Sequence, residues 1–122
     1  MSRIKILLGD PRHSTVGEHS NFVPIGIGYI GTNLLKQFEN YNLELKIETK
    51  TEKILALLET WKPDIVGLSH YVWNKFLSKF MCTYAKKINP DCYAFWVDQN
   101  FPLELVLGRL KIMIEIKLMT NA

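Results

Sequence analysis

The sequence predicts a single α/β domain, residues 1–122, in which a parallel sheet of four to five strands carries helices on both faces. Three observations support this fold class. Segments typical of strands and of helices alternate three times along the chain, and the links between them are short. The 122 residues suffice for one domain and are too few for two. Hydrophobic residues make up 48% and charged residues 22% of the chain, which is an ordinary globular balance.

Apolar runs of strand length predict the sheet. Ile4–Leu8 is short and rich in aliphatic residues, and we expect Gly9–Pro11 to end it in a turn. Leu43–Thr49 alternates apolar and polar residues, as a strand with one solvated face does. Ile65–Leu68 is unbroken and apolar, which favours a central strand covered on both faces, and Cys92–Val97 supplies a fourth strand.

Helical spacing of apolar residues predicts a helix after each of the first three strands. These segments are Ile25–Phe38, Thr51–Trp61 and Asn74–Ile88. Pro24 stands at the start of the first segment, where a helix tolerates proline. In the third segment large side chains recur at intervals of four residues: Phe76, Phe80, Tyr84 and Ile88. For Trp61, which ends the second segment, we expect a packing role.

The segment after Pro102 allows two interpretations. Within Leu103–Leu118, isoleucines alternate with other residues, which suggests a fifth strand at an edge of the sheet. Three leucines would equally suit a short helix before that strand: Leu105, Leu107 and Leu110.

Charge, cysteine content and hydropathy narrow the class of protein. The net charge is +3 and the basic residues are scattered, so nothing indicates a nucleic-acid partner. Cys82 and Cys92 are too few for an iron–sulfur cluster or a four-thiolate metal site. The N-terminal apolar run is short for a secretory signal, and no stretch is long enough to span a bilayer. We therefore expect a reduced, cytoplasmic protein without a membrane partner. The oligomeric state stays open.

Polar and aromatic residues gather after the predicted strands, where the carboxyl ends of a parallel sheet form the usual ligand site. Asp10 and His13 follow the first strand, and Ser69 and His70 end the third. Ring and amide side chains come next: Tyr71, Trp73 and Asn74. On the residues alone, ligand contact and packing are equally good interpretations of this run. The loop residues match no metal-site spacing, and no nucleophile stands in a recognisable hydrolase motif.

The glycines Gly26, Gly28 and Gly31 form a Gly-x-Gly-x-x-Gly run, the pattern of a dinucleotide-binding turn. That pattern normally turns directly out of the first strand, whereas roughly a dozen loop residues intervene here. We therefore interpret the glycines as letting the helix pack close to the sheet or to a flat ligand.

Three segments resemble the cobalamin-binding domain at the N-terminus of cobalamin-dependent radical SAM enzymes: KILLGDPRHSTVGEHSNFVPIGIGYIG, PDIVGLSHYVWN and NFPLE. Pro24–Tyr29 matches the Pro-[Leu/Ile]-Gly-[Leu/Ile]-Gly-Tyr opening of the first helix in that family. Gly67–Asn74 matches the Gly-Leu-Ser-x-Tyr-x-Trp-Asn edge after the third strand. The resemblance covers about residues 3–104 and leaves 105–122 as a divergent tail.

The resemblance implies a flavodoxin-like (Rossmann-like) sheet that holds a corrinoid over its carboxyl edge, with the nucleotide tail inserted beside the strands. The residues that it implies at the corrin are Pro24, Gly26, Gly28 and Tyr29. Those implied at the tail pocket or ring edge are Ser69, Tyr71, Val72, Trp73 and Asn74. Asp10, His13, His70 and Asn100 complete the expected cofactor-binding set. Cobalamin is the implied cofactor, and a radical SAM barrel is the implied partner domain.

Three departures from the family pattern limit what the resemblance implies. The Cys-x-x-x-Cys-x-x-Cys cluster motif is absent, so we expect a cofactor-binding part, free-standing or truncated, rather than an enzyme complete in itself. Many relatives have glycines after the fourth strand where this chain has Asp98 and Gln99. These two residues, together with the divergent tail after Glu104, leave an alternative open: a degenerate structural domain that kept the fold and lost cobalamin. His13 is not assigned to cobalt, because the spacing Asp10-x-x-His13 differs from the Asp-x-His-x-x-Gly motif.

Overall fold

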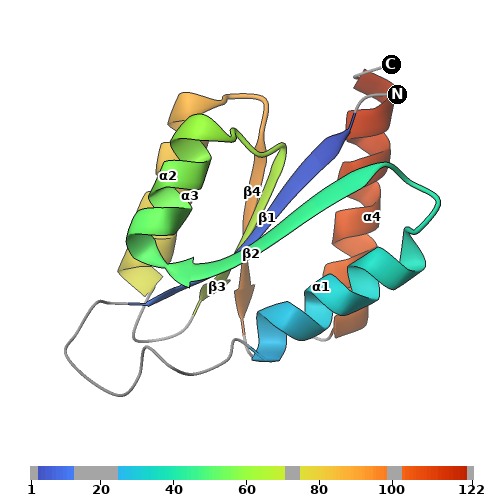
Figure 1. The fold of residues 1–122 in the computed structure, drawn as a ribbon, viewed down its shortest axis with the longest axis horizontal. Helices are drawn as coiled ribbons and strands as arrows, with labels where there is room; N and C mark the ends of the chain where they lie inside the picture. The colour runs from blue at the N-terminus through green and yellow to red at the C-terminus, as the bar shows by residue number, and fades with distance from the viewer. Residues whose placement is uncertain (1–2, 13–24, 71–74, 99–102, 121–122) are drawn as a thin grey trace.

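The computed structural model describes residues 3–12, 25–70, 75–98 and 103–120. Strands and helices alternate throughout these residues: β1 (Ile4–Arg12), α1 (Ile25–Gln37), β2 (Leu43–Lys50), α2 (Thr51–Thr60), β3 (Ile65–His70), α3 (Lys75–Ile88), β4 (Tyr93–Asp98) and α4 (Leu103–Thr120). The strands form one sheet in the order β2-β1-β3-β4, and each neighbouring pair is parallel (Figure 1). The predicted α/β, flavodoxin-like fold is confirmed.

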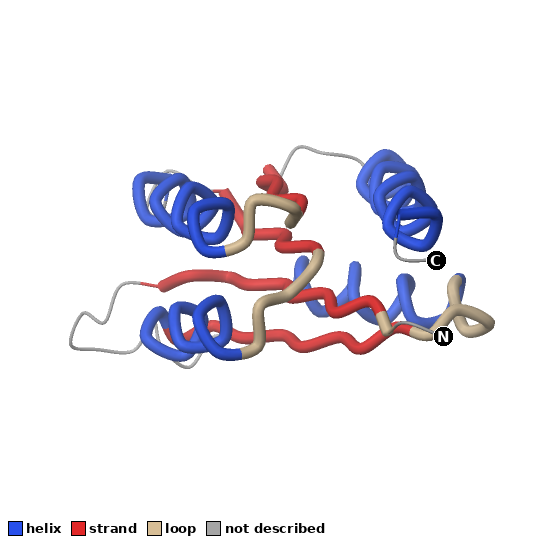
Figure 2. The backbone as a smooth tube through the Cα atoms, turned by 90° about the horizontal axis from the view of Figure 1, so that it is seen from above, coloured by secondary structure: helices blue, strands red, loops and turns tan. Residues whose placement is uncertain are grey.

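The helices cover both faces of this sheet, as expected. One face lies against α1 and α4, and the other lies against α2 and α3 (Figure 2). This arrangement follows from the parallel order of the strands, because each crossover helix must pack back onto the sheet to bury its apolar side.

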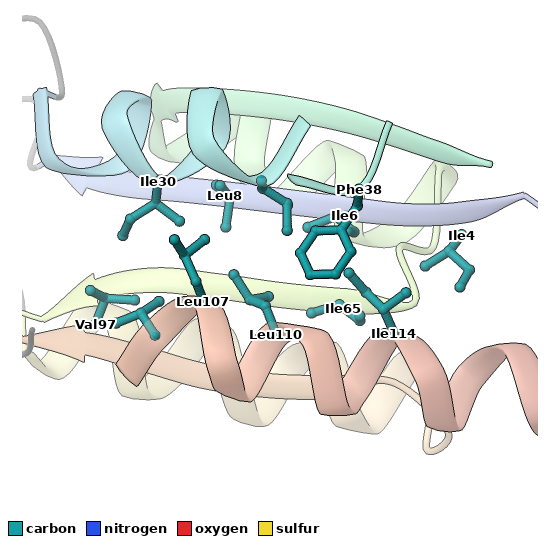
Figure 3. Close-up of a cluster of buried hydrophobic side chains, with 12 residues drawn as sticks. Ile4, Ile6, Leu8, Ile30, Phe38, Ile65, Val97, Leu107, Leu110 and Ile114 are labelled. Carbon is teal, nitrogen blue, oxygen red and sulfur yellow. The ribbon is translucent and has the colours of Figure 1, made fainter. Parts of the chain in front are cut away.

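Each face of the sheet has its own hydrophobic core. The core beneath α1 and α4 consists of aliphatic side chains and one phenylalanine, which Figure 3 shows interlocking: Ile4, Ile6, Leu8, Ile30, Leu34, Phe38, Ile65, Val97, Val106, Leu107, Leu110 and Ile114. The core beneath α2 and α3 includes smaller and sulfur-bearing side chains beside its leucines: Met81, Cys82, Ala85 and Cys92. The two cores hold the central strands β1 and β3 from both sides.

Strand β1 is longer than predicted, so the expected turn at Gly9–Pro11 is wrong. The strand continues to Arg12, and its register against β2 shifts between Gly9 and Arg12. The physical reason for the register shift is Pro11, which has no N–H to donate to the ladder. A strand accommodates a proline at such an irregularity.

The regularly spaced large side chains of α3 do not mark its buried face. Phe76 and Phe80 are 77% and 55% exposed, and Phe80 stacks on Tyr84 with ring centroids 5.8 Å apart. An interval of four residues exceeds the 3.6 residues of a helical turn, so such a row drifts by about 40° at each step. The row therefore begins in solvent at Phe76 and reaches the core only in its second half, at Tyr84 and Ile88.

The predicted fifth strand is also wrong, because the segment forms the single helix α4. The described residues contain a sheet of four strands. Alternation at Ile112, Ile114 and Ile116 misled the prediction because α4 is apolar on two sides. Ile114 is fully buried, whereas Ile112 and Ile116 are exposed. Lys117 lies on the inner side as well, where its ammonium group donates a hydrogen bond to the carbonyl of Asp91.

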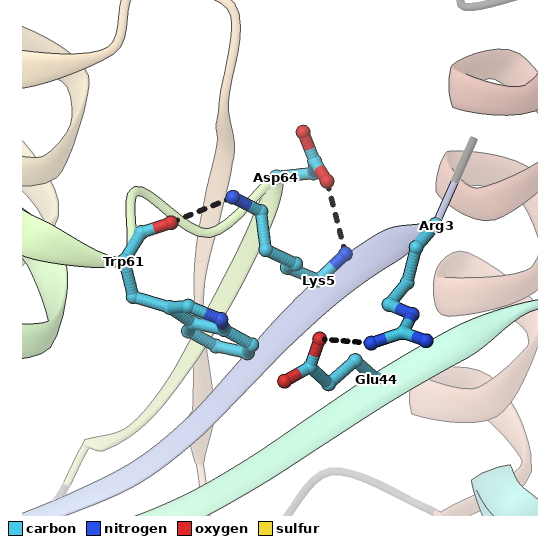
Figure 4. A network of polar contacts seen from close by, with 5 residues as sticks. All are labelled: Arg3, Lys5, Glu44, Trp61 and Asp64. Atoms are coloured by element: carbon cyan, nitrogen blue, oxygen red, sulfur yellow. Dashed lines mark hydrogen bonds and ion pairs between the residues drawn. The ribbon is translucent and has the colours of Figure 1, made fainter.

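Polar contacts fasten the amino edge of the sheet (Figure 4). The backbone N–H of Lys5 donates to Oδ2 of Asp64 at 2.9 Å, and the Lys5 ammonium donates to the carbonyl oxygen of Trp61 at 2.7 Å. Arg3 and Glu44 form an ion pair at 3.0 Å. Trp61 packs against the core beneath α2 and α3, so its expected packing role is confirmed.

Candidate functional site

The order of the strands defines where a ligand site is expected. β1 and β3 are neighbours in the centre of the sheet, although β2 and α2 separate them along the chain. The helix that follows β1 packs on one face, and the helix that follows β3 packs on the other. The carboxyl ends of these two strands, at the lower side of Figure 1, therefore form a topological switch point. Ligands of doubly wound sheets bind at such a point.

Two buried polar side chains meet at this switch point. Gly9 pairs with Leu68 in the ladder, so Asp10 and Ser69 follow side by side. The Ser69 hydroxyl donates a hydrogen bond of 2.6 Å to Oδ1 of Asp10. Ser69 is 1% and Asp10 8% exposed. A short bond from a hydroxyl to a carboxylate is of the strong, charge-assisted kind, so it ties β1 to β3.

Strand alternation decides which face of the sheet these side chains occupy. Leu8, two residues before Asp10, belongs to the core beneath α1 and α4. Side chains two residues apart on a strand point to the same face. The hydrogen-bonded pair of Asp10 and Ser69 therefore lies on the side of α1 and α4, beyond the carboxyl end of that core.

A third polar side chain, Ser78, reaches the same strand from the opposite face. Its hydroxyl donates a hydrogen bond of 2.5 Å to the backbone carbonyl of Ser69, and Ser78 is fully buried in α3. Sequence reasoning missed this residue, because a serine inside a helical segment gives no apolar signal. Ser69 at the end of β3 is therefore bonded to Ser78 on the face of α2 and α3, and to Asp10 on the face of α1 and α4.

Glycines beneath the switch point allow close packing. A Cβ on Gly67 would lie 2.6 Å from Cζ of Phe95, so the Phe95 ring fills the space over this part of β3. A Cβ on Gly31 of α1 would lie 3.0 Å from Cδ1 of Ile47. The interpretation that glycines let the first helix approach the sheet is confirmed for Gly31.

The structure brings together only part of the predicted site. Asp10 and Ser69 are in contact, and His70 ends β3 in register with Asp98 of β4. Gly26, Gly28 and Tyr29 lie in the first turns of α1, and only their backbone is described. The other expected site residues lie outside the described residues: His13, Pro24, Tyr71, Val72, Trp73, Asn74 and Asn100.

The described residues contain no group of three or more side chains that could hold a metal ion. Cys82 and Cys92 are free and buried. Burial raises the pKa of the Cys82 thiol from 9.0 to about 12, so this thiol stays protonated at neutral pH. No helix in the described part of the chain combines the length and apolar character of a membrane span.

Comparison of the chain with protein-family models, curated proteins and solved structures gives no match. The resemblance to cobalamin-binding domains therefore depends on the sequence segments alone.

Proposed function

We propose that this chain is a corrinoid-binding module that holds cobalamin over the carboxyl edge of its sheet. The observation that carries the proposal is the position of Ser69. This residue belongs to the GLSHYVWN segment that resembles the family, and it lies at the switch point bonded to Asp10. The corrinoid would supply a reactive cobalt, and a partner domain such as a radical SAM barrel would supply the substrate chemistry.

The chemistry of the two side chains suits such a ligand. The Ser69 hydroxyl donates its hydrogen bond to Asp10, and the oxygen of a hydroxyl that donates can also accept a hydrogen bond. The Asp10 carboxylate is also an acceptor. Cobalamin carries amide N–H groups around its ring and hydroxyl groups on its nucleotide tail, and these donors complement both residues.

The N-termini of α1 and α4, the two helices on the same face as Asp10 and Ser69, favour the binding of an anionic group. Both α1 and α4 begin at the carboxyl edge of the sheet (Figure 1). Their first N–H groups and the positive ends of their dipoles therefore face this edge. The phosphate of a nucleotide tail would be stabilised there.

A second candidate is the structural domain that has lost the cofactor, and two observations favour it. Ser69 and Asp10 are covered and bonded to each other, and Phe95 fills the space over Gly67. A ligand tail beside β3 would have to displace part of this packing. Bound corrinoid would rule this candidate out, and its absence would support it.

The direct test is a binding experiment with hydroxocobalamin. The protein is mixed with a small excess of this corrinoid and desalted. We expect a coloured complex near one corrinoid per chain, with a shifted corrin absorption spectrum. A colourless protein with an unshifted spectrum would contradict the proposal.

A matched pair of variants locates the site. Ser69→Ala and Ser78→Ala each remove one buried hydroxyl that bonds at the end of β3, so each should lower the free energy of unfolding by about 1–3 kcal/mol. Only Ser69 lies on the proposed ligand face. We expect Ser69→Ala to weaken hydroxocobalamin binding at least tenfold and Ser78→Ala to change it less than threefold. Equal effects would place the ligand elsewhere.

If the parent chain binds nothing, the double variant Asp98→Gly, Gln99→Gly tests the second candidate. These residues stand where many relatives have glycines. Gain of hydroxocobalamin binding in this variant would show that the chain lost its ligand through this loop. A variant that also stays colourless would count against a corrinoid ancestry of the site.

A further inference from the structure

The outward side of α4 is apolar, although nothing in the described chain covers it. The exposed fractions of its side chains are 45% for Leu105, 58% for Ile112, 39% for Ile116 and 77% for Met119. Their spacing of seven, four and three residues places them on one stripe of the helix. The core-facing residues Leu110 and Ile114 lie on the opposite side.

Gly108 lies on the same stripe. No atom of the described residues lies within 4 Å of the position where its Cβ would be. Glycine inside a helix is destabilising relative to alanine, and among the described residues no close neighbour requires it. A surface that packs closely against α4 would account for a glycine here. We call Leu105, Gly108, Ile112, Ile116 and Met119 the outer stripe.

Like any stripe along one face of a helix, the outer stripe is spaced symmetrically about its central residue, Ile112. Leu105 and Met119 lie seven residues to either side of Ile112, and Gly108 and Ile116 lie four residues to either side. In an antiparallel pair of helices centred on this residue, Leu105 would be level with Met119 of the second copy. We propose that a second copy of this chain docks here, α4 against α4, with the twofold axis beside Ile112.

In this arrangement Gly108, the small residue of the outer stripe, packs against a large side chain of the second copy. Ile116 of the second copy comes level with Gly108. There it meets a four-residue hole of the kind in which helices accept each other's side chains, formed by Leu105, Gly108, Arg109 and Ile112. A glycine at this point deepens the hole, so the two helices can approach closely.

The charges beside the stripe favour the antiparallel arrangement. Lys111 and Glu115 are exposed on the same flank of the stripe. A twofold antiparallel pair keeps like flanks together, which brings Lys111 within about 3 Å, along the axis, of the level of Glu115 of the second copy. Lys111 of the second copy comes equally close in level, but the twofold axis gives two Lys111–Glu115 approaches against one approach between the lysines. A parallel pair would set Lys111 beside the flank that carries Arg109, where like charges repel.

Cross-linking of the full chain tests the register. Ile112→Cys would place two thiols beside the axis, so mild oxidation should give a covalent dimer. The native thiols Cys82 and Cys92 are buried. The parent chain, oxidised in the same way, therefore shows how much covalent dimer forms without the new cysteine. A covalent dimer no more abundant than in the parent would overturn the proposal.

Two further cysteine variants distinguish antiparallel from parallel pairing. In the antiparallel pair Leu105 of one copy is about 21 Å along the axis from Leu105 of the other. Leu105→Cys alone should therefore form no covalent dimer, whereas a mixture of Leu105→Cys and Met119→Cys should form the mixed one. Self-linking of Leu105→Cys would overturn the proposed arrangement.

Sedimentation velocity over a range of protein concentrations tests the association itself. We expect a monomer–dimer equilibrium whose dissociation constant rises at least tenfold in Ile112→Glu, because two carboxylates would face each other at the axis. Phe76→Glu changes an exposed apolar residue on α3 and should leave the constant within twofold. Circular dichroism shows whether both variants keep their helices. A parent chain that is monomeric at every concentration, or a dimer lost with Phe76→Glu alone, would overturn the proposal.

Discussion

The helices on either side of β4 in the chain, α3 and α4, bury different kinds of surface. The inner face of α3 is built from small or sulfur-bearing side chains, and its phenylalanines Phe76 and Phe80 point to solvent. The inner face of α4 is built from large aliphatic side chains, and its outer face is apolar as well. Size and hydrophobicity of a side chain therefore do not identify the buried face of either helix. The contacts of each helix with the sheet identify its buried face.

The largest expected effect tests the orientation of α4. Ile114→Ala should lower the free energy of unfolding by about 2–5 kcal/mol, because Ile114 is fully buried against the sheet. Ile112→Ala is the matched control and should change it by no more than about 0.5 kcal/mol. Urea denaturation at low protein concentration measures both. A strand would put the two side chains on one face, so equal losses would contradict the helix.

The buried face of α3 predicts a dependence of stability on pH. The pKa of Cys82 is raised by burial from 9.0 to about 12, so the folded protein retains a proton that the unfolded chain loses. The contribution of the protonated Cys82 thiol to the free energy of unfolding is complete below pH 9. It is lost as pH rises toward 12, with a slope of at most about 1.4 kcal/mol per pH unit.

Urea denaturation at pH 8 and pH 10 checks this expectation. Cys82→Ala should make the decline in the free energy of unfolding shallower, and Cys92, whose pKa burial also raises, contributes to the decline that is left. Thr83→Ala, at an exposed neighbour, should retain the full decline. An equally steep decline in Cys82→Ala would assign the pH dependence to other groups.

The open outer face of α4 predicts a stabilising substitution. Gly108→Ala should raise the free energy of unfolding by about 0.5–1 kcal/mol at concentrations too low for association, because the new Cβ would meet no described neighbour. Gly67→Ala is the control and should destabilise, since its Cβ would lie 2.6 Å from Phe95. A loss of stability in Gly108→Ala would mean that a neighbour already fills this space.

The smallest expected effect concerns the outer face of α3. Phe76→Ser should change the free energy of unfolding by no more than about 0.5 kcal/mol, because Phe76 is 77% exposed. Met81→Ala, on the buried face of the same helix, should cost about 2–5 kcal/mol. Thermal or urea unfolding compares the two. A large loss of the free energy of unfolding in Phe76→Ser would indicate that the row of large side chains is the packed face of α3.

The order of strands and helices could be predicted because each element repeats its own apolar period between clear breakers. The buried face of α3 could not, since Ser78 and Ala85 carry little apolar signal. The form of the last segment could not, because isoleucines at alternate positions satisfy a strand and a helix with two apolar sides equally well. At the candidate site, the ends of the strands placed Asp10 and Ser69 at one edge. Their direct bond depends on β1 and β3 being neighbours, a long-range pairing that no local pattern contains.

The return path of α4 has a consequence for how this fold combines with others. β1 starts at the amino edge of the sheet, and α4 starts at the carboxyl edge and runs back, so the described chain enters and leaves at the same end (Figure 1). The switch point with Asp10 and Ser69 lies at the other end. Such a fold can be inserted as a cassette into a surface loop of a host protein, or tethered at either end. The carboxyl edge then points away from the host or tether, toward any neighbouring domain.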